Sequence, residues 1–411
     1  MTTTVTAADN APKVLISQSG RKGDPGTNGT NGNGFNQVRK SLLDNPLCHL
    51  FKTNKLVDTS APTGTDSDIT FTRASTATYV DRYGIVKTAA VDTIREEKDG
   101  FLIEESGTNL APYSEAFDNA AWTKSGSTVI TPNATTSPDG TANASKLDYT
   151  NTNDRLFEAI VNNTVESFTF SIWVKSTGAD RSIRLRLRNS PTTTNSAQTD
   201  FTATSEWQRF SVTLASLAEN LVVEMISIAV DLDFFIWGAQ LEQSPSRTSY
   251  IPTVGSAVTR LADKALLPVL NNVVTKKFSI FGILSNTSTA TATTGNKYIF
   301  RMPVSTGFFA LFYSPNQFVF RYDDSSTPLQ LGVVSTENIK YFAITSDGSN
   351  VKLNINGTEV TATKLTDPSL LLANNVSFFG ITGIAQSSGN IKDFRIYDFA
   401  LNANEIEYLL P

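Results

Sequence analysis

Cysteine and histidine are almost missing from this chain of 411 residues, which contains one of each, the neighbours Cys48 and His49. A single cysteine forms no intrachain disulfide, and the pair is too small a set of ligands for a Cys/His zinc site. Adjacent residues of an extended chain point to opposite faces, so Cys48 and His49 are poorly placed to act as nucleophile and base. One histidine also disfavours a Ser-His-Asp triad in the rest of the chain. We therefore expect no catalytic residues, no metal site of this kind and no cofactor.

Long apolar runs are missing as well, because no stretch approaches the roughly 20 residues that span a bilayer. The first residues lack the charged and apolar regions of a signal peptide. The net charge of -5 and the pI near 5.2 give no general attraction to nucleic acid or to anionic membranes. We expect a soluble protein that is not exported by the usual secretory route, binds no nucleic acid and does not insert into membranes. Its length suits two globular domains and an extension.

Glycine recurs at every third position near the N-terminus, at Gly20, Gly23, Gly26, Gly29 and Gly32. Only glycine fits the axis of a collagen triple helix, so this spacing predicts a collagen-like segment over residues 20–34. Five triplets are too few to hold three chains together alone, and the composition fits a flexible Gly/Asn linker equally well. Residues 1–19 show little periodicity, and we expect a flexible arm that docks on a partner.

Short alternating strands are predicted for most of the remaining chain. Period-2 runs separated by Tyr83-Gly84 and Asp99-Gly100 predict a strand-and-turn collar over residues 69–108. The pattern continues as two antiparallel β-sandwiches, over residues 109–255 and 256–411.

Individual strands and turns can be placed within these sandwiches. The segment from Ser167 to Lys175 puts four apolar side chains on one face and Trp173 on the other, so we expect both of its faces to be covered. Asp347-Gly348 and Asn356-Gly357 predict hairpin turns. Asn402 predicts the cap of a terminal helix.

Several segments resemble known families. The succession FTRASTATYVD, GIV, DGFLIE and TNLAPYSEAF resembles the junction segment of bacteriophage tail-fibre and other virion structural proteins. FSIWVK, EWQRFSVT, IWGAQLE and SYIPT resemble a carbohydrate-binding-module-like jelly roll common in phage tail proteins. In that family the tryptophans are mostly framework, so we expect Trp173, Trp207 and Trp237 in the core. The segment from Gly389 to Leu410 resembles the end of laminin-G/concanavalin-like sandwiches.

The resemblance implies a mainly β protein with two jelly-roll sandwiches after an extended N-terminal region. Phage fibres of this kind are threefold and often carry short collagen-like segments, which favours a homotrimer over a flexible linker. Residues 35–68, with apolar residues near helical spacing, would then form short helical turns on the threefold axis and a spacer, with Cys48 and His49 packed near that axis. Residues 1–19 would dock on other virion structural proteins, and the virion is the expected location.

A stripe of arginines is the first candidate for glycan contacts. Arg184, Arg186 and Arg188 alternate with apolar residues, and guanidinium groups bind carboxylate or phosphate through paired hydrogen bonds. The stripe fits an acidic surface glycan or a lipopolysaccharide phosphate. It fits as well a solvated face, a neighbouring subunit, or a face paired with Asp231 and Asp233.

Trp122 and a group near residue 322 are the other candidates. Trp122 lies in a loop-like stretch and suits sugar stacking or core packing equally. Arg321, Tyr322 and Asp323 follow a strand predicted at 317–320 and combine an aromatic platform with charged groups, as sugar sites do. The same bend fits a plain turn or a structural calcium ion. Asp323 and its neighbour Asp324 face opposite ways, so they form a poor glycosidase pair.

Three function classes remain open. We expect a virion fibre that adheres, without catalysis, to host cell-surface polysaccharide or lipopolysaccharide. The alternatives are a purely structural head or tail decoration and a polysaccharide-degrading tailspike. The sequence shows neither a long β-helix repeat nor a convergent acid pair, which disfavours the tailspike.

Overall fold

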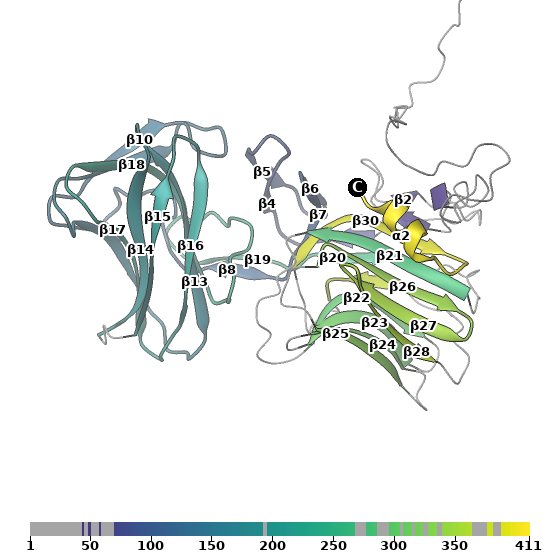
Figure 1. Ribbon diagram of the computed structural model, residues 1–411. Coiled ribbons are helices and arrows are strands. Elements are labelled where there is room, and N and C mark those ends of the chain that lie inside the picture. Colours follow the sequence, from purple (N-terminus) through teal and green to yellow (C-terminus); the bar gives the residue numbers. More distant parts are fainter. Residues whose placement is uncertain are drawn as a thin grey trace, which may run out of the picture. The chain divides into compact units, whose positions relative to one another are not determined.

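The computed structural model describes residues 43–44, 48–50, 57–58, 70–191, 195–267, 277–285, 296–304, 307–314, 317–323, 328–334, 339–363, 376–380 and 388–411. The architecture is mainly β, with antiparallel sheets that form sandwiches (Figure 1). The chain divides into two compact units, residues 46–401 and a unit of residues 1–45 with 402–411. The predicted fold class is confirmed. No helix within the described ranges is long and apolar enough to cross a membrane.

The first sandwich contains two sheets of five strands each among the described residues. In spatial order, the β13 sheet contains β10 (Val129–Thr135), β11 (Ala144–Tyr149), β18 (Leu232–Glu242), β13 (Ser167–Ser176) and β16 (Gln208–Ala215). The β14 sheet contains β15 (Ser196–Ala203), β14 (Arg181–Ser190), β17 (Asn220–Ser227), β12 (Arg155–Ile160) and β9 (Thr123–Ser125). Apolar side chains from both sheets, including Phe170, Leu185 and Val223, form one core.

Both faces of β13 are covered, as the sequence predicts. Phe168, Phe170, Ile172 and Val174 belong to the core between the sheets. Trp173 lies on the outer face, where it packs in a second cluster with Trp237, Tyr250 and Val86. Val86 comes from β5 (Val86–Ala89), which forms a hairpin with β4 (Ala77–Val80). The β4–β5 hairpin thus packs on the outer face of the β13 sheet.

The second sandwich uses strands from both sides of the first. One sheet contains β2 (Val57–Asp58), β1 (Cys48–Leu50), β30 (Gly389–Tyr397), β21 (Lys277–Ser285), β26 (Tyr341–Asp347), β27 (Asn350–Ile355) and β28 (Thr358–Thr363), with β7 (Gly100–Ile103) beside β30 and β6 (Arg95–Glu97) beside β7. The other contains β25 (Leu329–Val334), β24 (Gln317–Asp323), β23 (Gly307–Ser314), β22 (Lys297–Val304), β29 (Val376–Phe378), β20 (Lys264–Leu267) and β3 (Thr70–Thr72). Aromatic residues such as Phe300, Phe342 and Phe394 fill the space between the sheets.

One expectation for the N-terminal half needs correction. Residues 48–50 are not helical, because Cys48 and His49 lie in β1, which pairs with β2 and with the Phe394–Ile396 stretch of β30. The strand-and-turn stretch predicted over residues 69–108 does contain short strands, and three of them, β3, β6 and β7, belong to the large sheets. A further short pair joins β8 (Gly107–Asn109) to β19 (Val258–Arg260). The collagen-like glycines Gly20 to Gly32 and the arm of residues 1–19 lie outside the described residues.

The predicted turns and the predicted cap are confirmed. Asn356 and Gly357 both have positive φ, at 50° and 93°, and join β27 to β28 as a tight hairpin. Gly348, with φ of 95°, lies between β26 and β27. Helix α2 (Ala403–Leu409) begins at Asn402, whose side chain accepts a hydrogen bond from Glu405 N, and the Glu405 carboxylate accepts one in return from Asn402 N.

Candidate functional site

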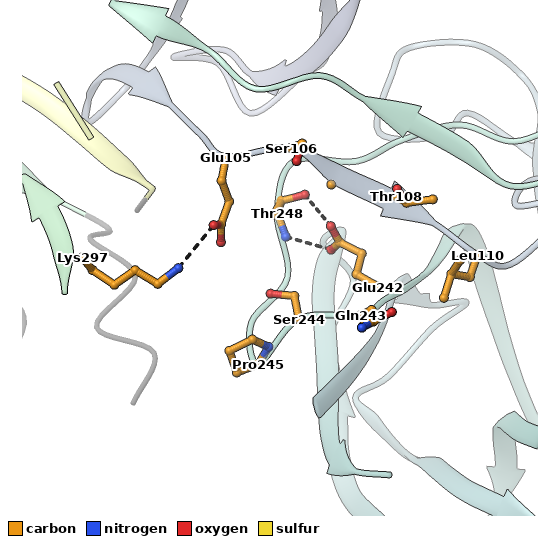
Figure 2. A pocket seen from close by; sticks show the side chains of 11 residues that line it. Glu105, Ser106, Thr108, Leu110, Glu242, Gln243, Ser244, Pro245, Thr248 and Lys297 are labelled. Carbon is orange, nitrogen blue, oxygen red and sulfur yellow. Dashed lines mark hydrogen bonds and ion pairs between the residues drawn. The ribbon is translucent and has the colours of Figure 1, made fainter. Parts of the chain in front are cut away.

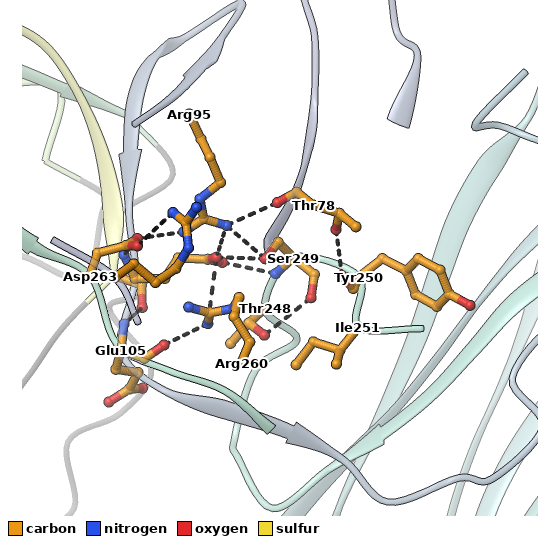
Figure 3. A network of polar contacts seen from close by, with 12 residues as sticks. Thr78, Arg95, Glu105, Thr248, Ser249, Tyr250, Ile251, Arg260 and Asp263 are labelled. Atoms are coloured by element: carbon orange, nitrogen blue, oxygen red, sulfur yellow. Dashed lines mark hydrogen bonds and ion pairs between the residues drawn. The ribbon is translucent and has the colours of Figure 1, made fainter. Parts of the chain in front are cut away.

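A buried network of charges joins the segments that carried the phage-fibre resemblance (Figure 3). Arg73 of FTRAS reaches Asp263 over 3.2 Å, and Arg95 reaches Glu104 over 2.7 Å and also contacts Asp263. Arg260 lies 3.5 Å from Glu104. These side chains are almost completely buried. The network therefore holds the strands around residues 73, 95, 104 and 260 together.

Glu104 is ionised at the centre of this network. Burial opposes its ionisation, but the charges of Arg260 and Arg95 and hydrogen bonds from Ser249 outweigh burial and lower the pKa of Glu104 to about 2. Its Oε1 accepts from Ser249 N over 2.8 Å, and its Oε2 accepts from Ser249 Oγ over 2.7 Å as well as from Arg95. Both carboxylate oxygens are fully engaged.

A cavity of about 450 Å³ lies beside the network. It is lined by the β4–β5 hairpin, by Glu97 of β6, by Trp173 of β13 and Arg209 of β16, by the returning segment 246–250, and by residues 388–390. The half-buried ring of Tyr79 and an edge of Trp173 supply aromatic surface. Aromatic surface with a few convergent polar groups is the usual lining of a small-ligand site.

The sheet and the returning segment position the arginines of this cavity. Trp173 and Arg209 are directly opposite in the pairing of β13 with β16, so they share the outer face of the β13 sheet. Arg209 donates from Nη1 to Thr248 O over 2.8 Å and from Nη2 to Ser171 Oγ over 3.0 Å. Arg247 donates from Nη1 to the backbone carbonyl of Arg209. The two guanidinium-bearing residues are thus fixed next to each other by backbone and hydroxyl acceptors.

The remaining carboxylate of the cavity is Glu97. It accepts hydrogen bonds from Val80 N and from Asn390 Nδ2, each over 3.0 Å. Burial raises the pKa of Glu97, and these two donors offset only part of that effect. Because Glu104 is held by ion pairs and Glu97 by hydrogen bonds, the cavity offers binding groups and no unengaged acid–base couple.

A second cavity, of about 470 Å³, has a different lining (Figure 2). Lys297 lies 3.4 Å from Glu105 at one side. Buried Glu242 accepts from Thr248 N and Oγ1 over 2.8 and 2.6 Å. A Cβ atom at Gly107 would lie 2.8 Å from Glu242 Oε1, so a larger residue there would displace the Glu242 side chain. Among the described residues that line this cavity none is aromatic, so it is the weaker candidate for a sugar site.

The arginines of the stripe lie on one outer face, as predicted, and pair with acidic residues other than Asp231 and Asp233. Arg184, Arg186 and Arg188 lie on the outer face of the β14 sheet, half-buried, while the residues between them belong to the core. Arg184 forms a bidentate pair with Asp200, at 2.6 and 2.8 Å. Arg186 and Arg188 both contact the fully buried Glu224.

The predicted partners of the stripe, Asp231 and Asp233, do not contact it. Asp233 pairs with Arg181 and Lys146, and Asp231 accepts from Arg181 through its backbone carbonyl. Of the alternatives for the stripe, pairing with acidic residues is found, but with Asp200 and Glu224 in place of Asp231 and Asp233. Register decides the partners, because Asp200 and Glu224 are directly opposite Arg184 and Arg186 on the neighbouring strands.

Trp122 packs in the core and is not a stacking platform for a sugar. Its side chain is 1% exposed, packs on Phe117 with ring centroids 5.0 Å apart, and donates from Nε1 to Tyr113 O. It therefore presents no face to a sugar. Trp237 is a buried framework residue, as the family resemblance implies, and Trp207 is half-buried with its Nε1 donating to Thr136 O.

The group near residue 322 needs a similar correction. The strand does not end at residue 320 but continues to Asp323, because Tyr322 pairs with Leu329 and Arg321 with Gln330 on β25. Tyr322 is 8% exposed and belongs to the core of the second sandwich. Arg321 lies over the ring of Phe308, at 5.4 Å from its centroid. The side chain of Asp323 is outside the described part.

The cavity residues Tyr79, Trp173, Arg209 and Arg247 were not predicted as a site. One sequence signal pointed toward it, because Trp173 falls on the face of its strand opposite the core residues. In the described part of the chain, no group of three or more His, Cys, Asp or Glu side chains is arranged to hold a metal ion.

Known proteins are similar to parts of this chain. No curated protein matches the sequence. Among solved structures, the binding domain of botulinum neurotoxin serotype G is 18% identical with a TM-score of 0.30, and the match covers 36% of this chain and 39% of that one. The CBM22-1-GH10 modules of endo-1,4-β-D-xylanase 10B from Clostridium thermocellum, complexed with xylohexaose, are 18% identical with a TM-score of 0.28, over 36% and 30%.

The matched region therefore covers well under half the length of each of those proteins. The family model of the concanavalin A-like lectin/glucanases superfamily matches residues 282–407. The C-terminal sandwich is thus of the concanavalin A-like lectin/laminin G type.

Proposed function

We propose that this protein is a bacteriophage virion fibre that adheres to host cell-surface glycan without catalysis. The observation that carries the proposal is the cavity beside the β4–β5 hairpin, where aromatic surface, arginines and the Asn390 carboxamide converge. Sugars are bound in this way, by ring packing on aromatic side chains and hydrogen bonds from planar polar groups. The lectin-type C-terminal sandwich is consistent with the same role.

The phage setting is supported by the residues that resemble virion junction segments. Those segments supply Arg73 and Glu104 to the buried network, so the resemblance and the network involve the same part of the chain. In this proposal residues 1–19 attach to other virion proteins and the collagen-like segment helps to form a homotrimer. Three copies of a weak site would give useful avidity on a cell surface.

The hydrogen bonds and protonation of the cavity carboxylates favour adhesion without cleavage. A glycosidase needs one carboxyl group as acid and another as base or nucleophile on either side of the sugar. Glu104 has both oxygens occupied by Arg95 and Ser249, and its low pKa keeps it from donating a proton. Glu97 alone provides no such couple.

The test is binding of labelled full-length protein to bacterial cells, extracted polysaccharides and a glycan array, with released sugar assayed in the same tubes. We expect saturable, sugar-competed binding, no release, and a loss of at least about tenfold in affinity for Tyr79→Ala. Tyr83→Ala is the matched control, because Tyr83 is 82% exposed at the tip of the same hairpin and lies outside the cavity.

The outcomes separate the three classes. Absence of binding by a trimer confirmed by light scattering would overturn adhesion and favour a structural decoration. Release of sugar would favour the tailspike. Equal affinities of Tyr79→Ala and Tyr83→Ala would refute the cavity as the binding site.

A further inference from the structure

The cavity contains two arginines that form no ion pair with the described residues. Within the described ranges, neither Arg209 nor Arg247 lies within ion-pair distance of a carboxylate, and their hydrogen bonds go to neutral oxygens. The Nε atom of Arg209 and the Nε1 atom of Trp173 are buried without hydrogen-bond partners. The other arginines of this unit's buried network, Arg73, Arg95 and Arg260, all face carboxylates.

The two guanidinium groups also disfavour each other. Burial, and after it the charge of Arg247, lowers the pKa of Arg209 to about 10, and Glu242 and Glu104 offset only part of that shift. Arg247 is exposed as a residue, but the atoms packed around its guanidinium group still lower its pKa, and the charge of Glu242 offsets part of that shift. Two neighbouring cations in a partly desolvated site are costly unless an anion accompanies them.

In the described part of the chain, the carboxylates nearest to Arg209 and Arg247 form no ion pair with them and are bound to other groups. Glu104 is neutralised by the buried network, and Glu242 accepts from Thr248. Glu97 is bound to Val80 N and Asn390. The two donors without partners and the two arginine charges without ion pairs therefore both favour binding of an anionic group from outside the protein.

We propose that the cavity takes an acidic sugar whose carboxylate contacts Arg247 and Arg209, with the sugar ring packed against Tyr79 and the edge of Trp173. This inference rests on the proposed glycan-binding function and names the class of sugar. A planar carboxylate matches the paired donors of a guanidinium group better than a hydroxyl does, and a charge-assisted hydrogen bond is about twice as strong as a neutral one. Asn390, Thr248 and Ser249 line the same cavity.

The experiment compares each acidic sugar with its own methyl ester, which keeps the ring and removes the charge. The probes are the methyl glycosides of glucuronic acid, galacturonic acid and N-acetylneuraminic acid, titrated into the full-length protein and followed by saturation-transfer NMR. We expect at least one acid to bind at least about tenfold more tightly than its ester, which corresponds to about 1.4 kcal/mol. Added salt should reduce this preference.

Two variants locate the effect. Arg247→Gln should abolish the preference for acid over ester, and it should leave the fold intact, because Arg247 is exposed and its described contact is with one backbone carbonyl. Arg181→Gln is the matched control, since it removes the same charge on β14, where Arg181 pairs with Asp233 outside the cavity lining. Its acid preference should equal that of the unmodified protein.

The results distinguish this inference from the proposed function. If cells and array glycans are bound but no acid exceeds its ester, or the preference persists in Arg247→Gln, the acidic-sugar assignment is overturned while adhesion stands. Tighter binding of sulfated or phosphorylated sugars than of any carboxylate would also overturn it. If neither array glycans nor the six probes bind, both proposals fail.

Discussion

Glu158 should make the first sandwich less stable as the pH rises. This residue is 2% exposed on β12, between the core residues Leu156 and Ile160 and opposite Val223 of β17. Its Oε2 atom has no hydrogen-bond partner. Burial raises the pKa of Glu158 from 4.5 to about 8. The carboxyl group is therefore protonated in the folded protein at pH 7, where the unfolded chain would have lost the proton.

The sign and size of the effect follow from proton linkage. Because the folded state holds the proton to higher pH, stability is full below pH 4.5, falls as the pH rises, and reaches a low plateau above about pH 8. Between pH 5 and pH 7 the unfolded chain releases a proton that the folded chain keeps, which costs roughly 2.5 kcal/mol at about 1.4 kcal/mol per pH unit. Glu158→Gln removes this dependence and should stabilise the sandwich at pH 7 relative to the unmodified protein.

The assay is urea unfolding at pH 5, 6 and 7, followed by tryptophan fluorescence. All four tryptophans, at positions 122, 173, 207 and 237, lie in the first sandwich, so the signal reports on it. Glu166→Gln is the control, because it makes the same chemical change at an exposed position next to β13. Equal pH dependence in Glu158→Gln and Glu166→Gln would refute the reasoning.

Two further predictions concern the buried network and a close backbone approach. Arg95→Met should lower the free energy of unfolding by about 3–5 kcal/mol, because it removes a buried guanidinium partner from both Glu104 and Asp263. Arg82→Met, which breaks only an exposed pair with Glu96, should cost less than about 1 kcal/mol, and similar losses for both in urea unfolding would contradict the network's role. Gly100→Ala should cost more than about 2 kcal/mol in the same assay, because Gly100 has φ of 119° and its Cβ would lie 2.5 Å from Ile391 O. Gly84→Ala, with positive φ but open space around it, should cost clearly less, and equal costs would show that the contact with Ile391 is unimportant.

The sequence alone determined features that depend on neighbouring residues along the chain. Strand alternation assigned Trp173 and the arginine stripe to outer faces, since side chains of a strand alternate with period 2. The Asn356-Gly357 turn and the Asn402 cap were likewise predictable, because each depends on backbone preferences within a few residues.

The tertiary structure alone decided which segments meet. Residues 48–50 become a strand because β30 offers a backbone edge, although the local apolar spacing favours a helix. Trp122 and Tyr322 are buried by distant strands, which no local pattern reveals. The candidate site also depends on tertiary structure. Its lining residues lie near positions 79, 97, 173, 209, 247 and 390, and they form a binding cavity only when the sheets bring them together. Sequence patterns therefore predicted the strands, whereas long-range packing determined the cavity and the charges that face it.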